Sequence, residues 1–224
     1  MRSMRTDRFR SVGWLGVTHK CDTLARMPAR LSRRFFARPT LRVARELIGC
    51  RLVRRIESRR VSGIIVEVEA YVGQDDQACH GRHGRTPRNA VMFGRAGVAY
   101  VYFTYGQHWM FNIVTEREGF ASAVLIRALE PVEGLDWMQT VRGRRPPHQL
   151  CNGPARLTQA LRIDRGLNGV DLCARGSAIA VEAGAPVHPR RVGRGPRVGV
   201  DYAPEPWRSK PWRFYLEDNP CVSK

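Results

Sequence analysis

Residues 66–112 read VEVEAYVGQDDQACHGRHGRTPRNAVMFGRAGVAYVYFTYGQHWMFN. The stretch opens with alternating branched apolar residues and glutamates, and glycine and aspartate follow, which predicts a β-strand that ends in a loop. Alternate residues of a strand share a face, so Glu67, Glu69 and Tyr71 should point the same way. Charged strand residues are usually solvated, but the end of a strand is also a common place for catalytic side chains.

A second strand is predicted at residues 98–105, with Tyr100 and Tyr102 on one face and a turn at Tyr105 and Gly106. Such a pair of rings is common in the packing of sheets. Rings interleaved with arginines also suit a flipped or single-stranded base, because every base offers a π face. The spacing alone leaves both interpretations open.

The loop between these strands, residues 73–97, is long and contains His80 and His83 among several arginines. Long loops in small domains are often functional, and the arginines could either contact phosphates or be solvated. Beyond the second strand, Asn112 and Arg127 each interrupt an apolar run. A buried arginine needs a partner, and Glu69 is a reasonable candidate.

Charge is the most informative feature of the composition. The 224 residues carry 38 Lys and Arg against 20 Asp and Glu, a formal charge of +18. This balance suits a polyanion, and nucleic acid is the first candidate. The only lysines are Lys20, Lys210 and Lys224, so a general compositional preference for arginine is the alternative explanation of the positive charge.

The six cysteines are scattered and include no CxxC pair, which is typical of a reduced, cytoplasmic protein. Cys79 and His80 are adjacent, but no second pair of ligands lies at zinc spacing, so we expect no metal and no cofactor. No segment has the run of about 18 apolar residues that a membrane span needs. We therefore expect no membrane association and a place near the nucleoid.

The order of the predicted elements indicates a single α+β domain with a mainly antiparallel sheet. The expected helices are residues 40–50, with Thr40 as the N-cap, 131–141 and 155–161. The expected strands are residues 51–56, 64–71, 98–105, 109–115, 121–128, 170–183, 197–200 and 213–216, with a polar turn at 57–62. Residues 1–34 hold nine Lys and Arg with little apolar periodicity, which predicts a disordered basic extension before a domain at 35–224.

Several short motifs recur in a fixed order from about residue 35 to residue 223. They are EVEAYVG, His80 nine residues after Tyr71, TPRN, the MF…YVY…YG run, Asn112, LIRALEP, NGPARLTQAL, RVGVDYA and KPWRFY. In this order the motifs resemble the alkyladenine (3-methyladenine) DNA glycosylase family, in its bacterial form. The resemblance implies a curved, barrel-like antiparallel sheet surrounded by helices, like the C-terminal domain of formyltransferases.

The resemblance also implies roles for site residues. Glu69 would be the general base that activates water, oriented by Arg127 and a nearby backbone carbonyl. Tyr71 and His80 would stack on one face of a flipped purine, and Tyr102 on the other. Tyr105 would be the wedge that enters the DNA and fills the gap left by the flipped base. Asn112 would lie against the purine edge and reject normal guanine.

The implied activity is hydrolysis of the N-glycosidic bond of damaged purines in duplex DNA, namely 3-methyladenine, 7-methylguanine, hypoxanthine and etheno-adenine. Without a lysine in the site motifs, the enzyme would be monofunctional and leave an abasic site. One asymmetric lesion needs one site, so we expect a monomer. Arg95 and Ala96 depart from the Pro-Pro pair that the family leads us to expect. A non-catalytic protein that binds damaged nucleic acid is the alternative.

Overall fold

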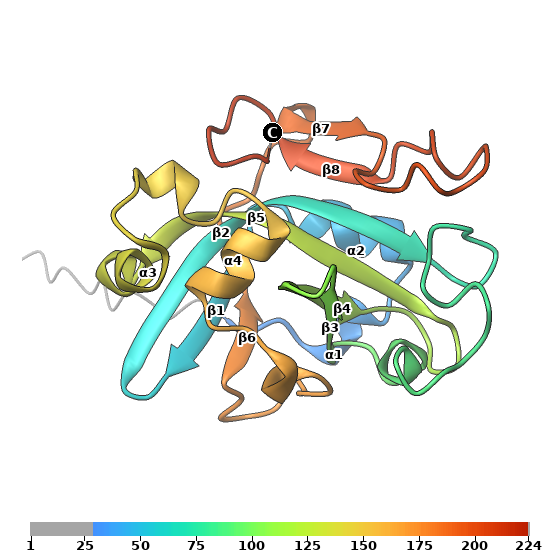
Figure 1. Cartoon of the computed structure of the whole chain (residues 1–224), viewed down its shortest axis with the longest axis horizontal. Coiled ribbons are helices and arrows are strands. Elements are labelled where there is room, and N and C mark those ends of the chain that lie inside the picture. Colours follow the sequence, from blue (N-terminus) through green and yellow to red (C-terminus); the bar gives the residue numbers. More distant parts are fainter. Residues whose placement is uncertain (1–28, 224) are drawn as a thin grey trace, which may run out of the picture.

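Two long strands organise the molecule. The computed structural model describes residues 29–223, so residues 1–28 of the extension expected at 1–34 lie outside this range and residues 29–34 lie inside it. Strands β2 (Arg59–Val72) and β5 (Ser122–Glu133) pair through residues 62–72 of β2 and cross the centre of Figure 1. Most residues of both strands are buried, as their apolar runs require.

One antiparallel sheet of eight strands is built on this pair. The order along it is β3, β4, β5, β2, β1, β6, and β8 pairs with both β2 and β7. The remaining strands are β1 (Arg51–Ile56), β3 (Ala99–Thr104), β4 (His108–Val114), β6 (Ile179–Glu182), β7 (Val192–Gly195) and β8 (Arg213–Leu216). The sheet curls into a half-barrel, which confirms the predicted α+β fold with a curved antiparallel sheet.

Helices cover the two faces of this sheet. Figure 1 shows α2 behind the central strands and α4 in front of them. The helices in the described part of the chain are α1 (Arg33–Phe36), α2 (Thr40–Leu47), α3 (Leu135–Arg142) and α4 (Pro154–Ala160). Their apolar sides complete a core that includes Phe36, Leu47 and Leu157. Within residues 29–223, no helix is long and apolar enough to cross a membrane.

The helix predicted at 131–141 begins later than expected. Pro131 and Glu133 still belong to β5, where they pair with Gly63 and Ser62. The break comes at Gly134, whose φ of 75° ends the strand, and α3 starts at the next residue. The prediction took Pro131 as the first helical residue, whereas β2 starts at Arg59 and extends the ladder past this proline.

Other differences have local causes. In the region predicted as strand 170–183, only β6 is a strand, because Asp171 turns the chain by accepting the Cys173 N–H at 2.8 Å. Residues 197–200 form a loop, since the Arg197 side chain is held by an aspartate and no ladder forms. Thr40 is the first residue of α2, not its cap, and its hydroxyl donates to Glu116 at 2.6 Å.

Candidate active site

The site begins where β2 changes its partner. The first half of β2 pairs with β1, and its residues 67–69 pair with β8. The β2–β5 register shifts between Glu67 and Val68, opposite residues 126–128 of β5, so Arg127 is the extra residue of a bulge. Bulges re-aim side chains. Glu67, Glu69 and Arg127 thereby meet on one side of the sheet.

Arg127 lies between two carboxylates. Its Nε is 3.0 Å from Glu67 Oε1, and one terminal nitrogen is 3.1 Å from Glu69 Oε1. The side chains of both glutamates are fully buried, and that of Arg127 is 8% exposed. The expected contact between Arg127 and Glu69 is therefore present. Sequence reasoning missed that Glu67 also binds this arginine, although strand alternation placed it on the same face.

Glu69 has two further partners. Its Oε2 accepts from the Tyr71 hydroxyl at 2.8 Å, and its Oε1 accepts from the backbone N–H of Val198 at 2.7 Å. The backbone group that contacts Glu69 is thus an N–H, where a carbonyl was expected. A carboxylate only accepts hydrogen bonds, so it needs a donor here. This loop contact joins residues 129 positions apart, and sequence patterns carry no signal for it.

The environment raises the pKa of Glu69 above the ordinary carboxyl range, mainly because burial penalises the charged form. Arg127, the Val198 N–H and the Tyr71 hydroxyl oppose this rise, and the charge of Glu67 adds to it. A buried carboxylate with a raised pKa and a cation beside it suits proton transfer near neutral pH. Glu69 is therefore the candidate general base of this site.

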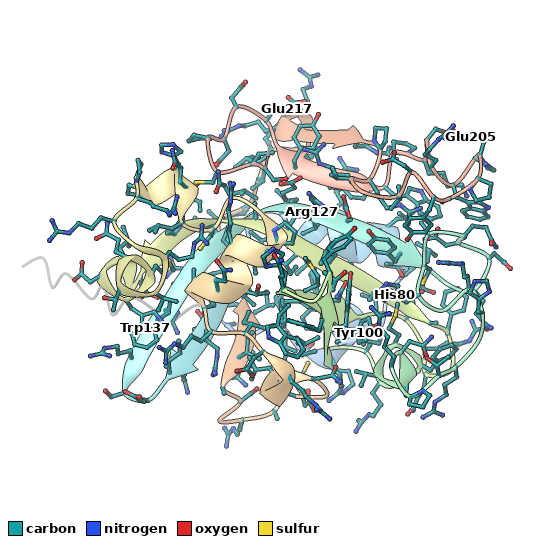
Figure 2. The ribbon with its side chains drawn as sticks, viewed as in Figure 1. His80, Tyr100, Arg127, Trp137, Glu205 and Glu217 are labelled. Atoms are coloured by element: carbon teal, nitrogen blue, oxygen red, sulfur yellow. The ribbon has the colours of Figure 1, made fainter. Side chains whose placement is uncertain are left out.

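Aromatic rings stand beside this base. The His80 ring meets the Tyr102 ring edge-on, with centroids 4.5 Å apart. His80 Nδ1 is 2.9 Å from the Tyr100 hydroxyl. Figure 2 shows His80 and Tyr100 labelled close together beside the β3–β4 hairpin, and Arg127 nearer the C-terminal segment. Tyr100 thus orients His80, and the sequence signal for this was its shared face with Tyr102.

The pKa of His80 is lowered to about 4, mainly by burial and in smaller part by the nearby cations Arg88 and Arg82. The imidazole is therefore neutral at physiological pH. A neutral ring can donate one hydrogen bond and accept another. Its chemistry here is positioning and stacking, and it does not carry a charge.

These side chains line a cavity of about 490 Å³, which we call the hairpin cavity. Asn112 reaches it from β4 and donates from its amide to the Tyr100 carbonyl at 3.1 Å. Every candidate site residue except Glu69 lines the cavity, and Glu69 lies directly behind Tyr71. The lining consists of Tyr71, Ala78, His80, Arg82, Arg88, Met92, Tyr100, Tyr102, Thr104, Tyr105, Met110, Asn112, Leu125, Arg127, Pro154, Val198, Gly199, Val200 and Tyr202.

Tyr105 projects from the rim of this cavity. Its side chain is 84% exposed, and its φ of 51° places it in the left-handed region. Gly106 follows with a φ of 65°, and the Gln107 N–H bonds back to the Thr104 carbonyl at 3.1 Å. Two positive φ values are the geometry of a tight hairpin turn, which glycine and asparagine favour. A tyrosine there is strained, and such strain is concentrated at functional sites.

A buried ion pair holds the opposite wall. Both terminal nitrogens of Arg197 contact Asp76, at 2.6 and 2.9 Å, and both side chains are fully buried. The Arg197 guanidinium also lies 4.8 Å from the Tyr71 ring centroid. Because Val198 is the next residue, this pair fixes the N–H that contacts Glu69. The aspartate gave no sequence signal beyond ending the β2 run.

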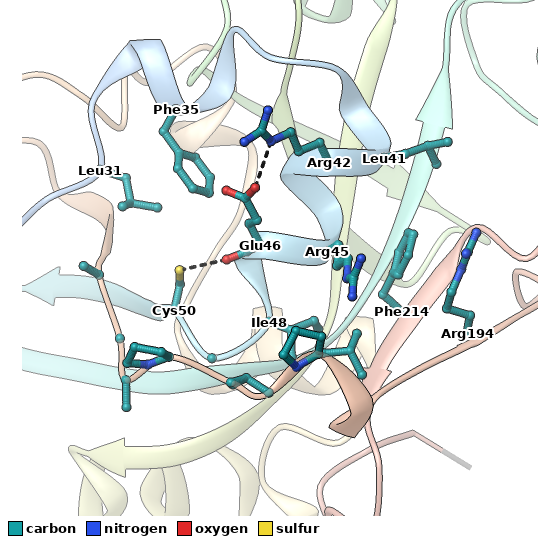
Figure 3. Close-up of a pocket in the computed structure, with 18 residues that line it drawn as sticks. Leu31, Phe35, Leu41, Arg42, Arg45, Glu46, Ile48, Cys50, Arg194 and Phe214 are labelled. Carbon is teal, nitrogen blue, oxygen red and sulfur yellow. Dashed lines mark hydrogen bonds and ion pairs between the residues drawn. The ribbon is translucent and has the colours of Figure 1, made fainter.

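A larger cavity of about 760 Å³ lies beside α2, and we call it the α2 cavity (Figure 3). Its walls are mainly apolar side chains such as Leu31, Ile48 and Phe214. Its carboxylate, Glu46, pairs with Arg42 at 2.9 Å and is partly exposed. Among the described residues that line this cavity, none is a buried carboxylate. Among residues 29–223, no three His, Cys, Asp or Glu side chains gather as a metal site would require.

The family model described as methylpurine-DNA glycosylase matches residues 34–220. The chain belongs to this family. Membership places it among the DNA glycosylases of base excision repair, and the recognition from sequence motifs is confirmed.

Curated relatives agree with the family model and carry the name "Putative 3-methyladenine DNA glycosylase". The relative from Methanocella arvoryzae is 50% identical over 195 residues, covering 87% of this chain and 96% of its own length. The relative from Carboxydothermus hydrogenoformans is 48% identical, covering 87% and 98%. The relative from Streptomyces avermitilis is 46% identical, covering 86% and 90%.

Proposed function

We propose that the chain is a monofunctional DNA-3-methyladenine glycosylase. It hydrolyses the N-glycosidic bond of alkylated or deaminated purines in duplex DNA and leaves an abasic site. One observation carries the proposal: the buried carboxylate of Glu69, held by Arg127 and the Val198 N–H, stands behind a cavity lined by aromatic side chains, among them those of Tyr71, His80 and Tyr102. This combination joins a base for water with walls for a planar ligand.

The target nucleotide must leave the base stack before the bond can be reached. Tyr105 is the wedge that fills the gap, since its ring is exposed at the tip of the β3–β4 turn beside the cavity. The loop arginines, including Arg82 and Arg88 on the cavity rim, contact phosphates and fix the duplex without reading its sequence. The net charge of +18 supports duplex DNA as the partner.

The flipped purine lies against Tyr71 and His80 on one face and Tyr102 on the other. In the unliganded geometry, the His80 and Tyr102 rings touch edge-on, so the base enters between them after a ring rotation. Electron-rich rings attract a cationic base, which favours alkylated purines such as 3-methyladenine and 7-methylguanine. Asn112, whose amide lies at the cavity wall, meets the exocyclic amine of guanine and so rejects the undamaged base. 7-Methylguanine carries the same amine, but its positive charge attracts the rings and weakens its N-glycosidic bond, which offsets this contact.

Glu69 takes a proton from a water molecule, and the water oxygen bonds to C1′ as the bond from C1′ to the purine nitrogen breaks. The bonding pair leaves with the purine. A cationic alkylated purine then departs as a neutral base, whereas hypoxanthine or etheno-adenine needs a proton on the ring. General-base catalysis contributes about 10²- to 10⁴-fold, and Arg127 keeps Glu69 ionised for this step.

The lysine chemistry of a combined glycosylase and lyase has no support at this site. Within the described residues the lysine is Lys210, whose Nζ lies 3.6 Å from the Trp207 ring centroid and 4.4 Å from that of Trp212. It does not line the hairpin cavity. The product is therefore an intact strand with an abasic site. The enzyme acts as a monomer, because one lesion needs one site.

The test is incubation of excess protein with separate duplexes that carry 7-methylguanine, 3-methyladenine, hypoxanthine or etheno-adenine. We expect release of free base, with the cationic lesions fastest, and no strand cleavage until alkali is added. Undamaged duplex of the same sequence is the control. Tight lesion binding without any base release would contradict the proposal and favour a non-catalytic damage-binding protein. Direct strand cleavage would contradict its monofunctional part.

A further inference from the structure

Glu67 is a second fully buried carboxylate, two residues before Glu69 on β2. Its Oε1 accepts from Arg127 Nε at 3.0 Å and from Arg213 Nε at 2.7 Å. The same oxygen accepts from the Ser223 hydroxyl at 2.9 Å, and its Oε2 accepts from the Ser223 N–H at 2.7 Å. Strands β2, β5 and β8 and the C-terminal segment therefore meet at this one side chain.

The four charged groups balance one another. Glu67 and Glu69 face Arg127 and Arg213, so two negative and two positive charges share a buried cluster. Ionised groups in an interior need such pairing, and removing one partner leaves an uncompensated charge. Arg127 touches both glutamates, which links the charge of Glu67 to Glu69.

Ser223 bridges Arg127 and Glu67 within this cluster. One Arg127 terminal nitrogen donates to the Ser223 hydroxyl at 3.2 Å, and that hydroxyl donates to Glu67. The guanidinium is thus fixed by Glu67 and Ser223 on one side and meets Glu69 on the other. A guanidinium fixed at two edges keeps its planar fork in one orientation.

We propose that Glu67, together with Ser223, is a positioning residue for the glycosylase reaction: it orients Arg127 and balances the positive charge that faces Glu69. The proposal rests on the proposed function, because the consequence appears in the proton transfer by Glu69. Without the Glu67 charge, Arg127 would have Glu69 as its one carboxylate partner in this cluster and would stabilise the ionised form of Glu69 more strongly. Glu69 would then be a weaker base.

Several titratable and charged groups surround Glu69, and they come from different parts of the chain. Arg127 comes from β5, Tyr102 from β3, and Glu67 and Tyr71 from β2, while Arg197 and the Val198 N–H come from the loop after β7. Arg213 of β8 contacts Glu67. Among them, Glu67 is the group whose negative charge raises the pKa of Glu69 through space. This direction fits the charge balance of the cluster.

The test measures single-turnover base release against pH for wild type, Glu67→Gln and Arg213→Gln, with thermal unfolding of each variant. For Glu67→Gln we expect a plateau about tenfold lower and an acid limb about one pH unit lower. For Arg213→Gln, which removes a positive charge, we expect the acid limb to move up. A general loosening of the fold is not expected to shift the acid limbs of the two variants in opposite directions. If one variant does not fold, the acid limb of the other alone tests the proposal.

Glu130→Gln is the matched control. Glu130 accepts from Asn219 at 2.7 Å, so it holds the same C-terminal segment without contacting Arg127. We expect its acid limb to coincide with that of wild type. If wild type releases base but the acid limbs of Glu67→Gln and Arg213→Gln stay in place, the Glu67 proposal is overturned and the proposed function stands. If wild type releases no base, the proposed function itself has failed, and the Glu67 proposal fails with it.

Discussion

The α2 cavity is larger than the hairpin cavity, about 760 against 490 Å³, but the candidate site residues gather at the smaller one. Apolar side chains line the α2 cavity, and its glutamate is paired and partly exposed. Behind the hairpin cavity lie a fully buried glutamate and an arginine with a partner on each side. The comparison teaches that buried charge held at a cavity, more than volume, marks the site.

Substitution of Glu69 should have the largest effect on the rate of base release. We expect Glu69→Gln to lower single-turnover base release by about 10²- to 10⁴-fold, because the amide cannot take the proton from water. Binding of lesion-containing duplex should persist, since the aromatic walls and the wedge are unchanged. Quench-flow release and equilibrium binding on the same duplex check both parts. A variant that releases base at the wild-type rate would remove Glu69 from the mechanism.

Tyr105 should have the next largest effect. We expect Tyr105→Gly to slow base release by roughly 10- to 100-fold, because a wedge compensates the few kcal/mol of unstacking. Thermal stability should stay equal or rise, since glycine suits the φ of 51° and the lost ring is 84% exposed. Calorimetry and an etheno-adenine fluorescence assay of flipping measure the two effects. Unchanged flipping would show that the wedge lies elsewhere.

A change of pH should have a smaller effect on the rate of base release. Base release should fall as the pH drops through the raised pKa of Glu69, so its acid limb should lie above that of an exposed glutamate. His80, with a pKa of about 4, should add no limb near neutrality. NMR titration of the imidazole checks this directly. An ionisation of His80 near pH 6.5, the ordinary value, would contradict the burial argument.

The same histidine links pH to stability. The unfolded chain binds the His80 proton near pH 6.5, whereas the folded chain binds it only near the lowered pKa of about 4. The unfolded state therefore holds more protons between these values, and the His80 contribution to stability is lost as the pH falls through them. Urea unfolding should show this loss in wild type and a weaker one in His80→Gln.

The smallest effect on base release should come from the α2 cavity. Ile48 is 5% exposed and lines this cavity. We expect Ile48→Ala to lower the free energy of unfolding by about 2–5 kcal/mol and to leave base release unchanged while the protein stays folded. Urea unfolding and single-turnover release on the same preparation check this. A large loss of release in the folded variant would mean that the two cavities are coupled.

Local patterns predicted some elements well. The short run RLVRRI predicted β1 with its observed bounds, and RFYL predicted β8. Strand β7 was missed because VGRG carries two glycines and no strand signal, yet it pairs with β8. Residues 197–200 look like a strand in sequence, but the buried bond from Arg197 to Asp76 takes them out of the ladder. Long-range contacts decided each of these outcomes.

The candidate site was predictable to the extent that family motifs name its side chains. Glu69, Tyr71, His80, Tyr102, Asn112 and Arg127 all come together at the hairpin cavity. The contacts that organise them could not be predicted, because Ser223 lies 156 residues from Glu67 and the Val198 donor is a backbone N–H. Periodicity predicts which residues share a face of a strand, but it does not predict which distant segment packs on that face.

The most direct test of the account compares Glu69→Gln and Ile48→Ala with wild type in one assay: single-turnover release of 7-methylguanine from duplex DNA at a temperature where all three proteins are folded. The account predicts loss of release in Glu69→Gln with binding retained, and wild-type release in Ile48→Ala. Release by Glu69→Gln at the wild-type rate would contradict the claim that the buried glutamate behind the hairpin cavity performs the reaction.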